Sequence, residues 1–224
     1  MADITMLNAD FSRRAVVHAA DIPWLPSPMP GIERRMLDRV GGEVARATSI
    51  VRYAAGSSFT AHSHGGGEEF FVLDGVFQDE HGDYPGGFYV RNPPGSSHTP
   101  RSGPGCTIFV KLWQFYASDN KTVRLDTRAL AFQPSANRPG VASAFLFRND
   151  EEEVRLERWP AHADIGLTFP AGGEILVLDG SFSDGGQEFQ YLSWLRTPSG
   201  DSLRAIAGQA GCKVWIKLGG KRPE

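Results

Sequence analysis

The sequence has little of what would point to secretion, membrane insertion or nucleic-acid binding. It holds only two cysteines, and 23 basic against 26 acidic residues leave a formal net charge of −3. Such a balance does not favour binding to nucleic acid or to an anionic membrane. No apolar run approaches the length of a transmembrane helix, and the first residues lack the apolar core of a secretory signal. We therefore expect a soluble, cytoplasmic protein.

Familiar catalytic patterns are also missing. No Ser-His-Asp or Cys-His arrangement stands out, and no glycine-rich loop leads into the lysine and helix start of a phosphate-binding loop. The two cysteines, Cys106 and Cys212, lie in similar stretches, "GCTIFVKL" and "GCKVWIKL". Equivalent positions in two copies of a motif favour buried thiols on strands over a disulfide or reactive thiols.

A duplicated segment organises the chain. The stretch "EFFVLDGVFQD" at 69–79 matches "EILVLDGSFSD" at 174–184, an offset of 105 residues, and the cysteine motif repeats with an offset of 106. Two copies at nearly one offset predict two domains of the same kind. The boundary is expected in the polar segment 117–140, which gives domains 1–120, with an N-terminal extension, and 121–224.

Each copy is predicted to consist of short strands. Runs such as "ATSIVRY", "EEFFVLDG" and "TIFVKLW" are rich in β-branched and aromatic residues, and Gly, Pro, Asn and Asp separate them. Many short strands between tight turns are typical of a sandwich or barrel. The best helix candidate, "IERRMLDRV" at 32–40, is short. The runs "FFVL" and "ILVL" are apolar on both faces, so their outer faces should pack against the sister domain or a second subunit.

The candidate functional residues lie in "HSHGGGEEFFVLDG" at 62–75. Residues two apart on a strand point the same way, so His62 and His64 share a face. The glycines permit a tight turn before Glu68 begins the next strand, and His98 follows a Pro-Pro-Gly turn. A single histidine is more often an ordinary polar residue. Three imidazoles and a carboxylate inside one barrel, however, would supply ligands for zinc, iron, nickel or manganese.

This stretch resembles the first sequence motif of the cupin family. Gly56, five residues, His-Ser-His at 62–64, three residues, Glu68, six residues and Gly75 fit that motif throughout. With this many fixed spacings, the resemblance is specific.

A second stretch resembles the other cupin motif. Gly87, five residues, Pro-Pro-Gly at 93–95, two residues and His98 fit it, and Ser102 stands where the family usually has asparagine. The resemblance implies an all-β fold of two tandem cupin barrels, also called double-stranded β-helices or jelly rolls. It implies one divalent metal ion per chain, bound by His62, His64, Glu68 and His98.

A narrower resemblance extends over nearly the whole chain. The segment 62–112 is similar to the cupin domain of ChrR-type anti-sigma factors, which binds zinc and contributes to stress sensing. This implies zinc as the preferred ion, with iron, nickel or manganese as alternatives, and a sensor or regulator of stress or of a metabolite. Those regulators also carry a sigma-binding domain with its own His and Cys zinc ligands. Here the N-terminal residues hold no cysteine and only His18, so direct sigma-factor binding is not expected.

The second copy departs from the metal-binding pattern. The positions that correspond to the ligands of "HSHGGGE" are Leu167, Phe169 and Gly173, and the fourth falls near Leu203 or Arg204. We therefore expect a degenerate second domain without metal ligands, which completes the architecture or forms an interface.

Two functions stay open at this point. In one, the metal is structural or exchanges ligands, and the chain is a sensor or regulator. In the other, the metal is ferrous iron with open positions, and the barrel is a non-haem dioxygenase that cleaves a small diketone or phenolic ketone. The expected partners are a small-molecule ligand and a second copy of the chain, in a homodimer; neither nucleic acid nor a membrane is expected.

Overall fold

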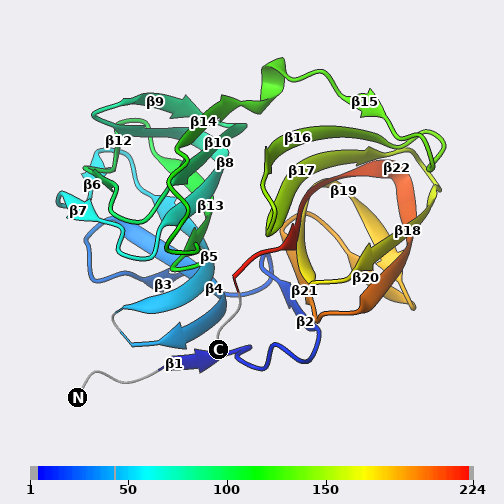
Figure 1. Ribbon diagram of the computed structural model, residues 1–224. Coiled ribbons are helices and arrows are strands. Elements are labelled where there is room, and N and C mark those ends of the chain that lie inside the picture. The colour runs from blue at the N-terminus through cyan, green and yellow to red at the C-terminus, as the bar shows by residue number, and fades with distance from the viewer. Residues whose placement is uncertain (1–4, 43, 222–224) are drawn as a thin grey trace. The chain divides into compact units, whose positions relative to one another are not determined.

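The computed structural model describes residues 5–42 and 44–221, which form two compact units built from β-strands. The first unit is formed mainly by Ile22–Ala129, and the second by Leu130–Gly220 together with Asp10–Asp21. Figure 1 shows the strands of the two units.

The first unit combines an eleven-stranded sheet with a separate two-stranded ladder. The strands of the sheet are β1 (Thr5–Leu7), β3 (Leu25–Pro26), β4 (Ile32–Gly41), β5 (Ala45–Tyr53), β6 (Ser57–Ser58), β8 (Glu68–Asp79), β9 (Gly82–Pro85), β10 (Phe88–Asn92), β12 (Arg101–Ser102), β13 (Cys106–Leu112) and β14 (Val123–Asp126). The ladder joins β7 (His62–Ser63) to β11 (Ser97–His98), and the 3-10 helix η1 spans Thr127–Ala129. No helix in the described part of the chain is long and apolar enough to cross a membrane.

The core of the first unit lies against β8, which runs between β10 and β13. Its consecutive residues Phe70, Phe71 and Val72 are all buried, so both faces of the strand are covered, as its apolar sequence predicts. The inward-facing cluster contains Ile32, Tyr53, Phe70, Val72, Phe77, Tyr84, Val90, Cys106, Ile108 and Val110.

The segment 32–40, the best helix candidate in the sequence, is a strand. It forms most of β4, which pairs with β5 from Ile32 opposite Tyr53 to Gly41 opposite Ala45, and also with β1 and β3. The register shifts between Met36 and Asp38. Such a bulge interrupts the alternation by which a strand is recognised in sequence. Hydrogen bonding to strands on both sides outweighs the local preference for a helix.

The second unit is a nine-stranded sheet. Its strands are β2 (Ala15–His18), β15 (Gln133–Pro134), β16 (Ala142–Arg148), β17 (Glu152–Trp159), β18 (Asp164–Phe169), β19 (Gly173–Asp184), β20 (Gln187–Phe189), β21 (Ser193–Thr197) and β22 (Asp201–Gly219). Strand β2 comes from the N-terminal region and pairs with β21, with Val16 opposite Leu195 (Figure 1).

The structural units therefore differ from the expected domains 1–120 and 121–224. The second unit begins its main segment at Leu130, inside the polar segment 117–140, and it also contains Asp10–Asp21. Asp10–Asp21 belongs to the second unit because its strand β2 pairs with β21 and completes the backbone hydrogen bonding of that strand.

The two cysteines occupy equivalent positions in the two units. Cys106 pairs with Gly75 across β13 and β8, and Cys212 pairs with Gly180 across β22 and β19. Both thiols are free and buried. Burial raises the pKa of Cys106 to about 11 and that of Cys212 to about 12. These are structural thiols, as the repeat indicates.

A buried carboxylate links several elements of the second unit. Glu157 on β17 is fully buried and accepts hydrogen bonds from Arg138 at 2.9 and 2.5 Å, from Arg155 Nε at 2.7 Å and from Trp159 Nε1 at 2.7 Å. Burial disfavours its charge, but the two arginines and the indole outweigh burial, so the pKa of Glu157 lies below its usual value.

We predict that Glu157→Gln destabilises the protein by about 3 kcal/mol at pH 7, because Arg138 loses its buried counter-charge and Arg155 keeps only that of Glu153. A group with a lowered folded-state pKa contributes stability above its unfolded pKa, and this contribution is lost as the pH falls through the folded pKa. The wild-type free energy of unfolding should therefore fall below about pH 5, and the variant should show a shallower fall. Denaturant unfolding from pH 7 to pH 4 measures this, with the exposed Glu151→Gln as control. Equal slopes in wild type and Glu157→Gln would contradict the prediction.

Candidate metal centre

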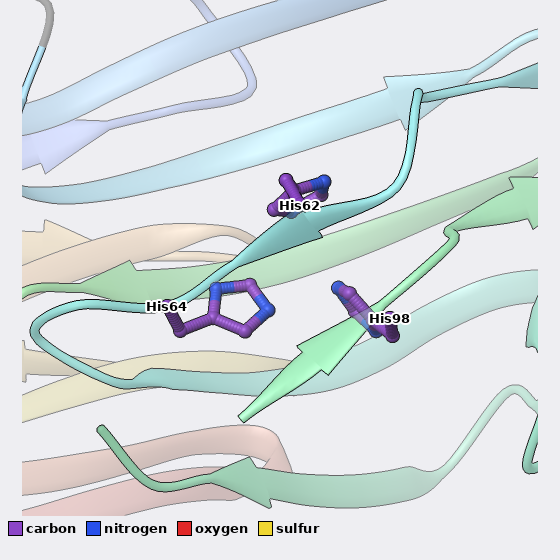
Figure 2. Close-up of side chains that lie close together, drawn as sticks. All are labelled: His62, His64 and His98. Carbon is purple, nitrogen blue, oxygen red and sulfur yellow. The ribbon is translucent and has the colours of Figure 1, made fainter. Parts of the chain in front are cut away.

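The four sequence-predicted ligands lie together in the first unit. Strands β7 and β11 pair so that His62 stands directly opposite His98. His64 follows β7, and its backbone amide donates a hydrogen bond to the carbonyl of Ser96 at 2.9 Å, which extends the contact beyond the ladder. Glu68 is the first residue of β8. Figure 2 shows the three imidazole rings turned toward one another.

The side chains of these residues form a compact donor set. One ring nitrogen from each of His62, His64 and His98 lies within 4.8 Å of the others. Glu68 Oε2 lies 3.5 Å from His64 Nε2 and 3.4 Å from His98 Nε2. His64, Glu68 and His98 are buried, and His62 is the most exposed of the four. Three nitrogens and one carboxylate oxygen around one point are donors that zinc and other divalent transition metals accept.

The hydrogen bonds of two rings fix which nitrogen is available. Nδ1 of His62 lies 2.9 Å from the carbonyl oxygen of Thr60, which can only accept, so Nδ1 carries the proton. Nδ1 of His98 lies 3.3 Å from Asp79 Oδ2. In the neutral rings, Nε2 is then left with a free lone pair. Nε2 of His64 and of His98 is buried and makes no hydrogen bond within the described chain. The residues therefore fit a divalent metal ion.

Asp79, at the end of β8, was not identified from the sequence, although it supports the site. It faces His98 Nδ1 and accepts hydrogen bonds from the backbone amide of His81 at 2.8 Å and from the Tyr84 hydroxyl at 3.1 Å. Arg124 Nε donates to that hydroxyl at 2.9 Å. Burial disfavours the charge of Asp79, but the bonds from His98, His81 and Tyr84 outweigh it and lower its pKa. An ionised Asp79 fixes the orientation of His98.

The surroundings of His64 and His98 shift the pKa values of the two side chains in opposite directions. Burial lowers the pKa of His64, and the neighbouring histidines add to this against the opposing effect of Glu68. His64 is therefore held neutral, as a metal ligand must be. Burial also disfavours the charge of His98, but the hydrogen bond with Asp79 and the charge of Glu68 outweigh it, so the pKa of His98 is raised.

Three consecutive glycines place His64 and Glu68 at the two ends of one tight turn. Gly67 has φ +76° and its amide donates to the carbonyl of His64 at 3.3 Å. A Cβ at Gly66 would overlap the indole of Trp113 and lie 2.8 Å from its Cα, and one at Gly67 would overlap the ring of Phe115. Trp113 itself has φ +61°, a conformation that is strained for a bulky residue. The glycines thus allow the chain after β13 to cover the ligand turn.

The second unit has apolar side chains at the corresponding positions. Leu167 on β18 pairs with Leu203 on β22, in the register in which His62 faces His98 in the first unit. Leu167, Phe169 and Leu203 belong to the buried core of this unit. Within the described residues, the one group of histidine, cysteine or acidic side chains suited to a metal ion is that of His62, His64 and His98.

Comparisons with known proteins agree with the fold. Residues 12–116 match the family described as the ChrR cupin-like domain. No curated protein matches the sequence. A candidate dioxygenase from Nostoc punctiforme has 15% identity and a TM-score of 0.75, over 95% of this chain and 88% of that one. A candidate glyoxylate-induced protein from Pseudomonas aeruginosa has 13% identity and a TM-score of 0.73, over 100% of this chain and 93% of that one. The pirin YhhW from Escherichia coli, in complex with nickel(II), has 12% identity and a TM-score of 0.67, over 92% of this chain and 99% of that one.

These likenesses concern the architecture. At such identities they establish a shared fold of two β-barrels, and activity and ligands do not follow from them.

We predict that Gly66→Ala lowers stability by about 2 kcal/mol, because the added methyl group pushes Trp113 away from the ligand turn. It should also weaken metal binding, since His64 and Glu68 flank that turn. Thermal unfolding and a competition titration with a chelator measure the two effects. Gly86→Ala is the matched control, because its Cβ would meet no atom closer than 3.6 Å. Unchanged metal affinity in Gly66→Ala would show that the turn does not position the ligands.

We predict that Asp79→Asn reduces metal affinity by about 10- to 100-fold, because His98 loses the carboxylate that orients its ring. The exposed Asp83→Asn, on the same hairpin, removes the same charge away from His98 and should bind metal like the wild type. Isothermal titration with zinc compares the three proteins. Equal affinities in Asp79→Asn and Asp83→Asn would mean that Asp79 does not orient His98.

Proposed function

We propose, from the premise that this chain is a cupin-superfamily protein resembling the ChrR cupin domain, that it binds one divalent metal ion and acts as a sensor or regulator. The proposed ligands are His62, His64, Glu68 and His98. The second barrel is proposed to bind no metal and to support the first.

One observation carries the metal-binding proposal. The buried Nε2 atoms of His64 and His98 lie 3.5 and 3.4 Å from Glu68 Oε2, and neither has a hydrogen-bond partner within the described chain. A buried polar atom without a partner costs about 1–3 kcal/mol. A cation shared by both rings and the carboxylate would satisfy all three groups at once.

Zinc is the proposed occupant. Three neutral imidazoles and one carboxylate leave the site with a net charge of +1 for any divalent ion, so charge does not distinguish zinc from iron, nickel or manganese. Support for zinc comes from the resemblance to the ChrR domain. The nickel-bound pirin shows that this fold also accommodates another divalent ion.

The sensor proposal follows from how the ligands are distributed along the chain. An ion would tie the β7–β11 ladder to the first residue of β8, so metal affinity and the stability of the first unit would be coupled. A chemical event that removes one ligand, such as oxidation, would loosen both segments together. The bound ion would supply this cross-link, while Asp79 holds the His98 ring in place.

We predict one metal ion per chain, and a melting temperature that falls when the metal is removed and recovers when zinc is added. Elemental analysis and calorimetry measure both. His62→Ala should lose the ion. His162→Asn, in the second unit, should retain it and keeps a side chain that tolerates the φ of +61° at that position. Two ions per chain, or an ion that survives His62→Ala, would contradict the proposal.

A second candidate function is supported by the likeness to the candidate dioxygenase from Nostoc punctiforme. In this reading the ion is ferrous iron, and the barrel cleaves a small diketone or phenolic ketone with dioxygen. Oxygen uptake by the iron-loaded protein with a β-diketone or a hydroxyacetophenone, abolished by His98→Ala and inhibited by zinc, would decide for the enzyme. Absence of uptake under these conditions, together with zinc-dependent stability, would support the sensor.

A further inference from the structure

A cavity of about 550 Å³ lies in the second unit, where side chains of β16 and β17 face β15, the loop after it and Gly166 on β18. All of its lining residues fall within Leu130–Gly220, so the cavity belongs to the second unit alone. Its lining does not include Leu167, Phe169 or Leu203, the counterparts of metal ligands. The cavity is therefore distinct from the positions that bind metal in the cupin pattern.

Three arginines line this cavity, and the same two carboxylates hold all three. Arg138 donates to Glu157 through Nη1 at 2.9 Å and through Nη2 at 2.5 Å. Arg155 donates through Nε to Glu157 at 2.7 Å and through Nη1 to Glu153. Arg148 donates to Glu153 through Nε at 2.8 Å and through Nη2. Three positive and two negative charges give a net charge of +1, and one nitrogen of each guanidinium takes no part in these bonds.

An aromatic ring lies beside this charged group. Strands β16 and β17 run side by side (Figure 1), and Phe145 stands directly opposite Arg155, so both side chains project from the same face of the sheet. Arg155 is 8% exposed, whereas Phe145 is 51% exposed. The guanidinium of Arg148 lies over the Phe145 ring, with Cζ 4.4 Å from the ring centroid. The cavity therefore combines a buried positive group with a flat apolar surface open to solvent.

We propose that this cavity binds a small monocarboxylate with a flat aromatic body. The anion neutralises the net charge of +1, and guanidinium groups bind carboxylates through parallel N–H donors. A phosphate group carries a charge of about −1.5 to −2 at pH 7, which is more than this group neutralises. The aromatic body lies against Phe145 and Arg148.

The cavity is prepared for such a ligand before it binds. The volume of about 550 Å³ is typical of a small-molecule site. The ion pairs with Glu153 and Glu157 already hold the guanidinium groups in place, so little side-chain ordering is needed on binding. This inference does not depend on the proposed metal centre, because no residue of the first unit takes part.

The test titrates benzoate into the full-length protein and follows binding by NMR. Benzamide has the same ring without the charge and should bind about tenfold more weakly. Arg148→Gln removes the charge of the most exposed arginine of the three and should weaken benzoate binding about tenfold. Arg158→Gln is the matched control, because Arg158 also lies on β17 or its partner strand but stacks on Phe132 and does not line the cavity.

Phe145→Ala tests the aromatic surface. It should weaken benzoate binding about fivefold, and Tyr191→Ala, which removes another exposed ring of the second unit, should leave it unchanged. Melting temperatures establish that each variant is folded. Losses in Arg148→Gln and Phe145→Ala, with both controls like the wild type, would support the inference. Absence of benzoate binding, equal affinity for benzamide, tighter binding of inorganic phosphate, or wild-type affinity in both cavity variants would overturn it.

Discussion

The candidate metal centre depends on one short antiparallel ladder, in which β7 and β11 place His62 directly opposite His98. Two residue pairs give such a ladder little stability of its own. Neighbouring backbone bonds extend it: the His64 amide donates to Ser96, and the Gly95 amide donates to the His64 carbonyl, each at 2.9 Å. The side chains that meet across it are polar and gain little from burial without a shared partner. An ion bound there would therefore contribute to the local fold as well as to function.

The second unit shows how the same register is stabilised without such a centre. There, Leu167 faces Leu203, and both belong to a continuous apolar core. Burial of a leucine side chain contributes about 1.5–3 kcal/mol, and this does not depend on the supply of an ion, on pH or on oxidation. The duplicated fold thus combines one barrel whose stability would respond to its chemical surroundings with one whose stability would not. This asymmetry suits a sensor, since only the first barrel would loosen when the metal is lost.

The strands, and the gathering of the four candidate ligands at one place, could be predicted because both follow from local patterns. The runs around 68–75 and 106–112 are apolar between turns, and the four candidate ligands stand at fixed spacings that do not depend on the details of packing. Features that depend on distant pairing could not be predicted. The bulge at Met36–Asp38 disguised β4, and β2 belongs to the second unit only through its partner β21. No sequence motif marks Asp79, because its role arises from its contact with His98, which lies 19 residues away in the sequence.

The adjacent carboxylates Glu68 and Glu69 differ in whether the second copy of the fold has a counterpart. Glu69 accepts a hydrogen bond from Tyr89, and its counterpart in the second copy, Glu174, accepts one from Trp194 at 3.0 Å. Both are buried, so this carboxylate is a feature that the two sheets share.

Glu68, unlike Glu69, has no acidic counterpart in the second copy. Asn92 donates to Glu68 at 3.0 Å, whereas in the second copy glycine replaces the glutamate and Thr197 donates instead to the backbone carbonyl of Gly173 at 3.3 Å. The second copy has neither the carboxylate nor its amide partner, and a hydrogen bond from the threonine side chain to a backbone carbonyl stands in their place. Because the second barrel folds without them, the architecture does not require Glu68 and Asn92 in the first copy, whereas the proposed metal ion would.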